Sequence, residues 1–287
     1  MGMKLTSINI INNELILQHE ILRVSQSYDD SLTVKMARLW HNTFRDIFSH
    51  RQLWLFPLLA GTFWFATLTT LLLRWVSLGR PQYPGQVNPY VPFISDIGAQ
   101  TFQPVFIVGC TVTGICFFGT VFAVHHVRYS PKFYGLTDDA RWKQGVSLLA
   151  LITGLAAAVS LVLLSVFDTY KAHTRHLYLL LGTFGGLFIS ALTTTIVWWD
   201  QARGGVVFVG LRKWCILNIV LVLCQFVVGT VFVILLRSGN FYIAGILEWC
   251  LTYMGSFWLL SFIGYTRFRE GENPVLKDQG ERQPLLA

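Results

Sequence analysis

The sequence predicts an all-α, polytopic membrane protein: a bundle of six transmembrane helices with an N-terminal interfacial amphipathic helix. Of its 287 residues, 53% are hydrophobic and only 13% are charged, which is about half the charged fraction of an ordinary soluble domain. Apolar runs long enough to cross a bilayer recur six times. Within each run the apolar residues are continuous instead of alternating, which indicates helices and not barrel strands.

The elements follow one another in a simple order along the chain. Residues 1–34 form a polar extension with no clear element. Residues 35–52 carry aromatic and aliphatic side chains at helical spacing, interspersed with Lys and Arg, and so predict an amphipathic helix on the cytoplasmic leaflet. The alternative is a basic flank that only sets topology. The transmembrane domain, 53–265, contains the runs Leu53–Leu73, Gln103–Val124, Gly145–Phe167, Leu177–Trp198, Trp214–Leu236 and Tyr242–Tyr265. We expect residues 266–287 to form a disordered tail.

The distribution of positive charge predicts the orientation of the bundle. The net charge is +7, and the Lys and Arg residues that flank the spans number fifteen on one side and five on the other. Because Lys and Arg concentrate in cytoplasmic loops, both termini are expected in the cytoplasm. The basic excess is therefore a topology signal, and we expect no nucleic-acid partner.

The connections constrain how the spans pack. The first outer loop, residues 74–102, holds four prolines and is expected to be ordered but not helical. Short connections make spans 3 and 4, and spans 5 and 6, antiparallel neighbours. Small residues predict close helix packing, with no further role, at Gly109, Gly114, Gly119, residues 154–158, Gly182, Gly185 and Gly186.

Ionisable residues near membrane depth are costly, and they give the best signal for a site. The ionisable residues that stand out all fall on the predicted outer side: Asp96, Asp168, His173, His176 and Glu248. The deepest is Glu248, which lies ~9 Å of helix rise into the sixth span. The predicted ligand-binding residues are Ser95, Asp96, Asp168, His173, His176 and Glu248.

A carboxylate at the depth of Glu248 needs a partner, and we expect His173, His176 or Arg175 to provide it. A purely structural hydrogen bond is the alternative. His173 and His176, with Asp168 or Glu248, could hold zinc, but His-x-x-His is a weak signal and we predict no metal and no cofactor. Named catalytic motifs are absent from the sequence, so we assign no catalytic residue.

The tail carries an acidic dileucine pattern. Glu281 stands four residues before the pair Leu285 and Leu286, in a polar segment on the predicted cytoplasmic side. This predicts recognition by sorting adaptors and location in an endosomal, lysosomal or vacuolar membrane. A tail that ends in two leucines by chance is the alternative, and the plasma membrane and Golgi are alternative locations.

Three segments also carry a resemblance: 89–98 (PYVPFISDIG), 167–176 (FDTYKAHTRH) and 244–249 (AGILEW). Together they resemble the six-span FRAG/DRAM family, in the right order over about residues 50–267, with the fungal branch most similar. The family contains damage-regulated autophagy modulators, a GPI-anchor remodelling factor of PGAP type and a fungal regulator of plasma-membrane phosphatidylinositol 4-kinase. The resemblance implies lipid handling or lipid-linked signalling. The extension over residues 1–35 departs from the family and stays unexplained.

These observations lead to one expected function and two alternatives. We expect a non-enzymatic membrane regulator that binds an outer-leaflet lipid and acts in lipid homeostasis, phosphoinositide signalling or autophagy, with membrane lipids and a lipid-kinase complex as partners. The first alternative is a lipid or GPI-anchor remodelling enzyme that uses Asp168, His173, His176 and Glu248 as acid, base or metal ligands. The second is a small transporter or scramblase, although one acidic residue in a span makes a poor conduction path.

Overall fold

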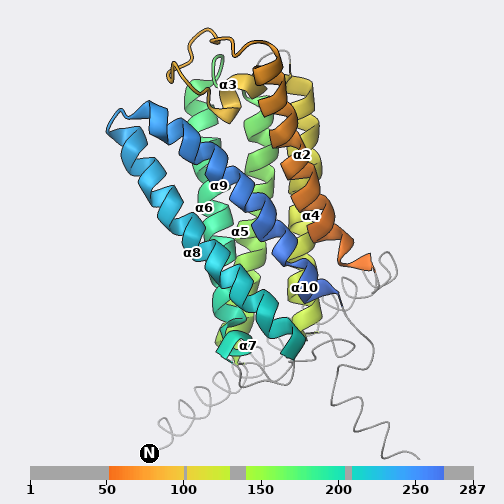
Figure 1. Ribbon diagram of the computed structural model, residues 1–287. Helices are drawn as coiled ribbons and strands as arrows, with labels where there is room; N and C mark the ends of the chain where they lie inside the picture. The colour runs from red at the N-terminus through yellow and green to blue at the C-terminus, as the bar shows by residue number, and fades with distance from the viewer. Residues whose placement is uncertain (1–51, 100–101, 130–139, 204–208, 268–287) are drawn as a thin grey trace, which may run out of the picture. The chain divides into compact units, whose positions relative to one another are not determined.

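The computed structural model describes residues 52–99, 102–129, 140–203 and 209–267 (Figure 1). The predicted amphipathic helix, apart from its last residue, lies outside these ranges. So do the polar extension, the dileucine motif and almost all of the tail. The statements below concern the described residues.

Six helices are long and apolar enough to cross a membrane, as the sequence predicts. They run as α2 (Leu55–Ser77), α4 (Gln103–Tyr129), α5 (Arg141–Val166), α6 (His173–Val197), α8 (Val209–Arg237) and α9 (Phe241–Ser261), the last continued by α10 (Ile263–Thr266). Two short helices lie between them: α3 (Ile94–Gly98) and α7 (Trp199–Arg203). The all-α membrane bundle is thereby confirmed.

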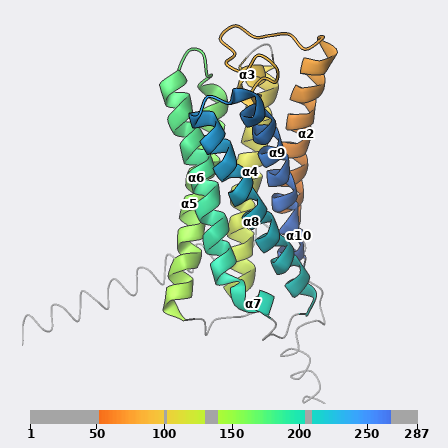
Figure 2. The same ribbon diagram turned by 60° about the vertical axis from the view of Figure 1, so that its left-hand side comes forward.

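Successive spans run antiparallel and pack in a consistent order. The pairs α5 with α6 and α8 with α9 are close neighbours, as their short connections predict, and α4 packs on both α2 and α5 (Figures 1 and 2). Helix α9 packs against α2, which brings the last span back to the first. We call the end that holds α3 the upper end and the end that holds α7 the lower end (Figure 1).

Helix α8 is the least embedded of the six spans. Only 11% of its most apolar stretch is buried, against 33–44% for the other five. It packs on α9 and meets α6 only sparsely. This separation leaves internal space between α6 and α8, which the site described below occupies.

Several small residues do allow close helix approach, but one does not. A Cβ at Gly109 would overlap the side chain of Thr67, and one at Gly186 would lie 2.9 Å from the Cβ of Ala157. Gly185, by contrast, has no atom within 4 Å of the place where a Cβ would stand. The expectation that Gly185 is a packing residue is therefore wrong, because its side of α6 faces open space.

Over its described residues, 74–99, the first outer loop is ordered, but the expectation that it has no helix is wrong. Its prolines end at Pro92, and α3 begins two residues later. The Asp96 carboxylate accepts a 3.0 Å hydrogen bond from the backbone N–H of Phe93, which supplies half of a capping box. This local bond allows one helical turn to form directly after the proline-rich segment.

The lower end is tied together by a buried arginine. The side chain of Arg128 in α4 is fully buried, and its Nη2 lies 3.4 Å from Oδ2 of Asp200 in α7. Its guanidinium carbon lies 4.8 Å from the ring centroid of Trp198. Lys143 of α5 lies 3.1 Å from the same Asp200 oxygen. One carboxylate thus joins α4, α5 and α7.

Candidate functional site

Glu248 points into the bundle near the upper end and meets the first outer loop. Its side chain is buried, and its Oε2 accepts a 2.9 Å hydrogen bond from the backbone N–H of Ile94. Ile94 is the first residue of α3, where N–H groups have no partner within the helix and need an external acceptor. The carboxylate of α9 supplies that acceptor.

The expected pairing of Glu248 with His173, His176 or Arg175 is wrong. Among the described residues, its side chain bonds only to the Ile94 N–H. The guanidinium of Arg175 instead stands 5.8 Å from the ring centroid of Phe167. Helix α3 comes between span 6 and the α5–α6 loop, so it takes the bond that we assigned to that loop.

Further contacts seat the loop on the start of α9. The Trp249 indole N–H donates a 3.1 Å bond to the carbonyl of Pro92, and the Asn88 amide donates a 2.7 Å bond to the carbonyl of Phe241. Asn88 is fully buried, and a Cβ at Gly245 would overlap its amide. Glycine at position 245 therefore allows the loop to lie directly on the helix.

Asp96 links α3 to the loop between α5 and α6. The Tyr170 hydroxyl donates a 3.2 Å bond to Oδ1 of Asp96, whose Oδ2 caps α3. Burial raises the pKa of Asp96 above its ordinary value, although the bonds from Phe93 and Tyr170 act in the opposite direction. Span 6 and the α5–α6 loop are thus coupled through α3 and not directly.

Asp168 and His173 belong to the α5–α6 connection itself. Oδ1 of Asp168 accepts bonds from the N–H groups of Tyr170, at 3.0 Å, and Lys171, at 2.7 Å. Desolvation raises the pKa of Asp168, but these N–H groups and the Lys171 ammonium outweigh it and bring the pKa below its ordinary value. His173 is exposed, and its Nδ1 lies 3.3 Å from the carbonyl oxygen of Thr169. Both residues shape the turn.

His176 is buried, and its tautomer follows from one contact. Its Nδ1 lies 2.7 Å from the carbonyl oxygen of Phe167. A carbonyl can only accept, so Nδ1 carries the hydrogen, and in the neutral ring Nε2 then presents a lone pair. Nε2 is buried and makes no hydrogen bond with the described part of the chain.

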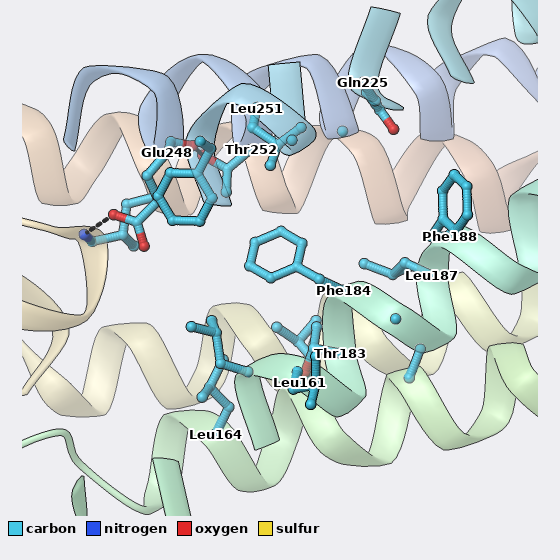
Figure 3. A pocket seen from close by; sticks show the side chains of 18 of the residues that line it. Leu161, Leu164, Thr183, Phe184, Leu187, Phe188, Gln225, Glu248, Leu251 and Thr252 are labelled. Atoms are coloured by element: carbon cyan, nitrogen blue, oxygen red, sulfur yellow. Dashed lines mark hydrogen bonds between the residues drawn. The ribbon is translucent and has the colours of Figure 1, made fainter. Parts of the chain in front are cut away.

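A cavity of about 860 Å³ lies between these residues and the middle of the bundle. All six long helices contribute to its walls, α2 through Trp64 alone, and α3 lies at the upper end. Most lining side chains are apolar, and Figure 3 shows Phe184 between Glu248 at one end and Gln225 at the other. Its volume lies within the usual range for small-molecule sites.

The cavity opens sideways toward the surface that the bilayer would cover. Leu181 of α6 and Phe226 of α8 line it, yet their exposed fractions are 70% and 52%. Both helices would face hydrocarbon at this depth, so the opening leads into lipid and not into water.

The structure divides the predicted site residues into two groups. Ser95, His176 and Glu248 line the cavity, whereas Asp96, Asp168 and His173 do not. Asp96 supports α3, and the other two belong to the α5–α6 turn. The described residues contain no group of three or more His, Cys, Asp or Glu side chains placed to hold a metal ion.

Sequence reasoning missed polar residues deeper in the cavity. Besides His176 Nε2, three lining atoms are buried without a hydrogen bond to the described chain: Thr113 Oγ1, Gln225 Nε2 and Trp258 Nε1. Buried polar atoms are normally paired, so a set of unpaired atoms around one cavity is unusual. A signal was present for Gln225, an amide inside an apolar run, but we considered only ionisable residues there.

Comparison with known proteins gives a family match and a curated relative. Residues 52–264 match the family described as the Frag1/DRAM/Sfk1/Cwh43P N-terminal domain. A curated relative, Protein sfk1 of Schizosaccharomyces pombe, is 28% identical over 149 residues, which are 52% of this chain and 44% of that protein. The chain therefore aligns with less than half the length of this relative. No solved structure matches the chain.

The family match covers all six spans and includes the α3 loop and the Glu248 region that form the upper end of the cavity. The chain is an integral membrane protein that belongs to the Frag1/DRAM/Sfk1/Cwh43P family.

Proposed function

We propose that this protein is a non-enzymatic membrane regulator that binds an outer-leaflet lipid in the cavity between α6 and α8. The observation that carries the proposal is the cavity itself, which has apolar walls, polar groups at its upper end and an opening toward the bilayer. Lipid tails suit the apolar walls. A polar headgroup suits the end where His176 and Glu248 lie.

The orientation rests on the charge distribution. The Lys and Arg residues that flank the spans number fifteen on one predicted side of the membrane and five on the other. The five belong to the connections at the upper end, which favours a cytoplasmic lower end. The cavity's polar end then lies in the outer leaflet. Cysteine labelling of intact cells tests this, because a cysteine at Arg141 should resist an impermeant reagent and one at Lys171 should react.

A lipid bound between α6 and α8 could act as a signal. A ligand shifts a conformational equilibrium only if it binds one arrangement more tightly, and an occupied cavity favours the arrangement in which these helices stand apart. Helix α7 packs against α8, and its Asp200 pairs with Arg128. We propose that this route reports lipid binding to cytoplasmic partners in lipid homeostasis, phosphoinositide signalling or autophagy, including a lipid-kinase complex.

The proposed location rests on Glu281, Leu285 and Leu286, which lie outside the described residues. Recognition of this motif by sorting adaptors would direct the protein to endosomes and a lysosome or vacuole. Fluorescence microscopy of a Leu285→Ala, Leu286→Ala variant tests the motif, because an unchanged location would remove it from the proposal.

The alternative of a lipid or GPI-anchor remodelling enzyme has weaker support. It requires Asp168, His173, His176 and Glu248 to act on one substrate, but only His176 and Glu248 line the cavity. Asp168 already accepts two backbone hydrogen bonds in its turn. The four residues therefore do not form a single site.

Blocking the cavity tests the proposed function. A tryptophan at Gly185 would project into the space, whereas one at Gly145 tests the same change outside it. Both glycines have no atom within 4 Å of their Cβ position, but only Gly185 lines the cavity. Lipid extraction and mass spectrometry of the purified variants should show a specific co-purified lipid in wild type and Gly145→Trp, and loss of it in Gly185→Trp.

The regulatory role needs a readout in cells. In cells that depend on this protein, deletion and Gly185→Trp should both alter phosphatidylinositol 4-phosphate at the plasma membrane, and Gly145→Trp should not. Equal lipid occupancy in the two variants would contradict the proposal, provided both melt as wild type does.

A further inference from the structure

We infer that the cavity selects a lipid with a hydrogen-bond donor at its head, a hydroxyl or a primary ammonium, and a carbonyl acceptor further along its length. This inference rests on the proposed function and adds the chemical class of the ligand. It follows from the kind of polar atom that the cavity presents at each depth.

The upper end presents acceptors. His176 Nε2 carries a lone pair in the neutral tautomer fixed by the Phe167 carbonyl, and it is buried without a partner in the described chain. The second carboxylate oxygen of Glu248, Oε1, makes no hydrogen bond there, and no described Lys, Arg or His forms an ion pair with Glu248. A hydroxyl or ammonium of the ligand would donate to His176 Nε2, and a second N–H or O–H of the ligand would pair with Glu248 Oε1 and offset the cost of burying that carboxyl group.

The deeper part presents donors. Gln225 Nε2 is a donor only and is buried without a partner among the described residues; Thr113 Oγ1, also unpartnered, can donate as well. A plain hydrocarbon tail would leave both unpaired. An ester or amide carbonyl would accept from them, so the ligand carries an acceptor at this level.

The spacing of the two levels fits an acyl-linked lipid. Glu248 lies seven residues below the upper end of α9, and Gln225 lies twelve residues below the upper end of the adjacent α8. At ~1.5 Å per residue, the donor level is roughly 7 Å deeper than the acceptor level. Figure 3 shows the two residues well separated along the cavity. Head donors and ester carbonyls in diacylglycerol or phosphatidylethanolamine follow this same order.

Native mass spectrometry of the full chain, with lipids added in matched pairs, tests the inference. Dioleoylphosphatidylethanolamine is compared with dioleoylphosphatidylcholine, and dioleoylglycerol with its O-methyl ether, because each second lipid lacks the head donor. We expect at least one pair to show a preference of about threefold to tenfold for the donor, as one hydrogen bond supplies. The pair that responds identifies the source, an amine or a hydroxyl lipid. Ester-linked lipids should likewise bind more tightly than their ether-linked analogues.

Three variants assign the preferences to atoms. His176→Asn places an amide N–H near the position of Nδ1, which retains the bond to Phe167, but it removes Nε2; the head-donor preference should fall. Glu248→Gln retains an acceptor for Ile94 and turns an NH₂ donor into the cavity, so the same preference should fall. Gln225→Met should abolish the ester preference and leave the head-donor preference intact.

The outcomes separate the inference from the proposed function. Suppose that Gly185→Trp loses lipid. If neither donor pair then shows a preference, or if the ester preference is absent or does not depend on Gln225, the ligand class is wrong and the lipid-binding function stands. If Gly185→Trp binds lipid as wild type does, the proposed function itself is wrong.

Discussion

The carboxylate of Glu248 and the backbone N–H of Ile94 form a 2.9 Å hydrogen bond between residues 154 positions apart in the chain. It attaches the first outer loop to the last span at the upper end of the cavity. Neighbouring bonds from Trp249 to Pro92 and from Asn88 to Phe241 hold the same two segments together. The upper wall of the cavity therefore depends on contacts between the loop and α9.

Glu248→Ala should destabilise the protein more than Glu248→Gln. Alanine leaves the buried N–H of Ile94 without an acceptor, which typically costs about 1–3 kcal/mol, whereas the glutamine amide oxygen can still accept. Thermal unfolding in detergent measures both variants. Equal losses for the two would mean that the Ile94 bond is not the main role of the side chain.

Two adjacent glycines of α6 should respond in opposite ways to alanine. A Cβ at Gly186 would stand 2.9 Å from the Cβ of Ala157 and 3.0 Å from the carbonyl oxygen of Thr153. Gly186→Ala should cost about 1–3 kcal/mol through overpacking of α5 against α6. Gly185→Ala should be neutral, or stabilising by up to ~1 kcal/mol through helix propensity, because Gly185 faces the cavity. Similar melting temperatures for the two variants would contradict the open space beside Gly185.

Asp200→Ala should weaken the lower end. Removal of one partner of a buried ion pair typically costs about 3–5 kcal/mol, and we expect at least ~2 here because Asp200 is 36% exposed while Arg128 is fully buried. Lys143→Gln is the matched control. Its side chain is 20% exposed and can reach water, so its loss should stay under ~1 kcal/mol. The free energy of unfolding should therefore fall more for Asp200→Ala, and a larger loss for Lys143→Gln would overturn this ranking.

Asp168 should give a stability contribution that disappears in acid. Its native pKa lies below the ordinary 3.8, so the contribution is present above the ordinary pKa and is lost as pH falls through the native value. Asp168→Ala should melt below wild type at neutral pH, and the difference should narrow as the pH drops below 3.8. Melting curves across this range measure it, and Asp168→Asn should show a smaller loss because its amide oxygen still accepts.

Asp96 should contribute to stability with the opposite pH dependence from Asp168. Burial raises its native pKa, so its contribution is present below the ordinary pKa and is lost as pH rises through the native value. Relative to wild type, Asp96→Asn should therefore gain stability as the pH rises. A difference that follows the trend of Asp168 would show that the carboxyl is not desolvated.

The sequence predicted the spans well because bilayer thickness requires long apolar runs. Helix ends were less predictable, since α4 extends to Tyr129 through His125, His126 and Arg128. Hydrophobicity reports where hydrocarbon ends, whereas a helix continues until its backbone bonds end. The helix α3 was missed because four prolines dominate its loop, although Asp96 caps the turn that follows them.

The site was predicted only in part, for physical reasons. Glu248 was identified because a carboxylate in an apolar run is rare, but its partner is a backbone N–H, which has no side-chain signature. The cavity arises from the separation of α8 from α6, which depends on packing between distant segments and not on local composition. The buried amide of Gln225 indicates a binding site only once the cavity that it lines is known.

The most direct test of a lipid site is a cryo-electron microscopy map of the full chain in lipid nanodiscs. The proposed function predicts an elongated density between α6 and α8 that begins beside His176 and Glu248 and extends toward Gln225. Gly185→Trp should remove this density and leave the six spans in place. A wild-type map in which α8 packs directly against α6, with the cavity closed, would contradict lipid binding at this site.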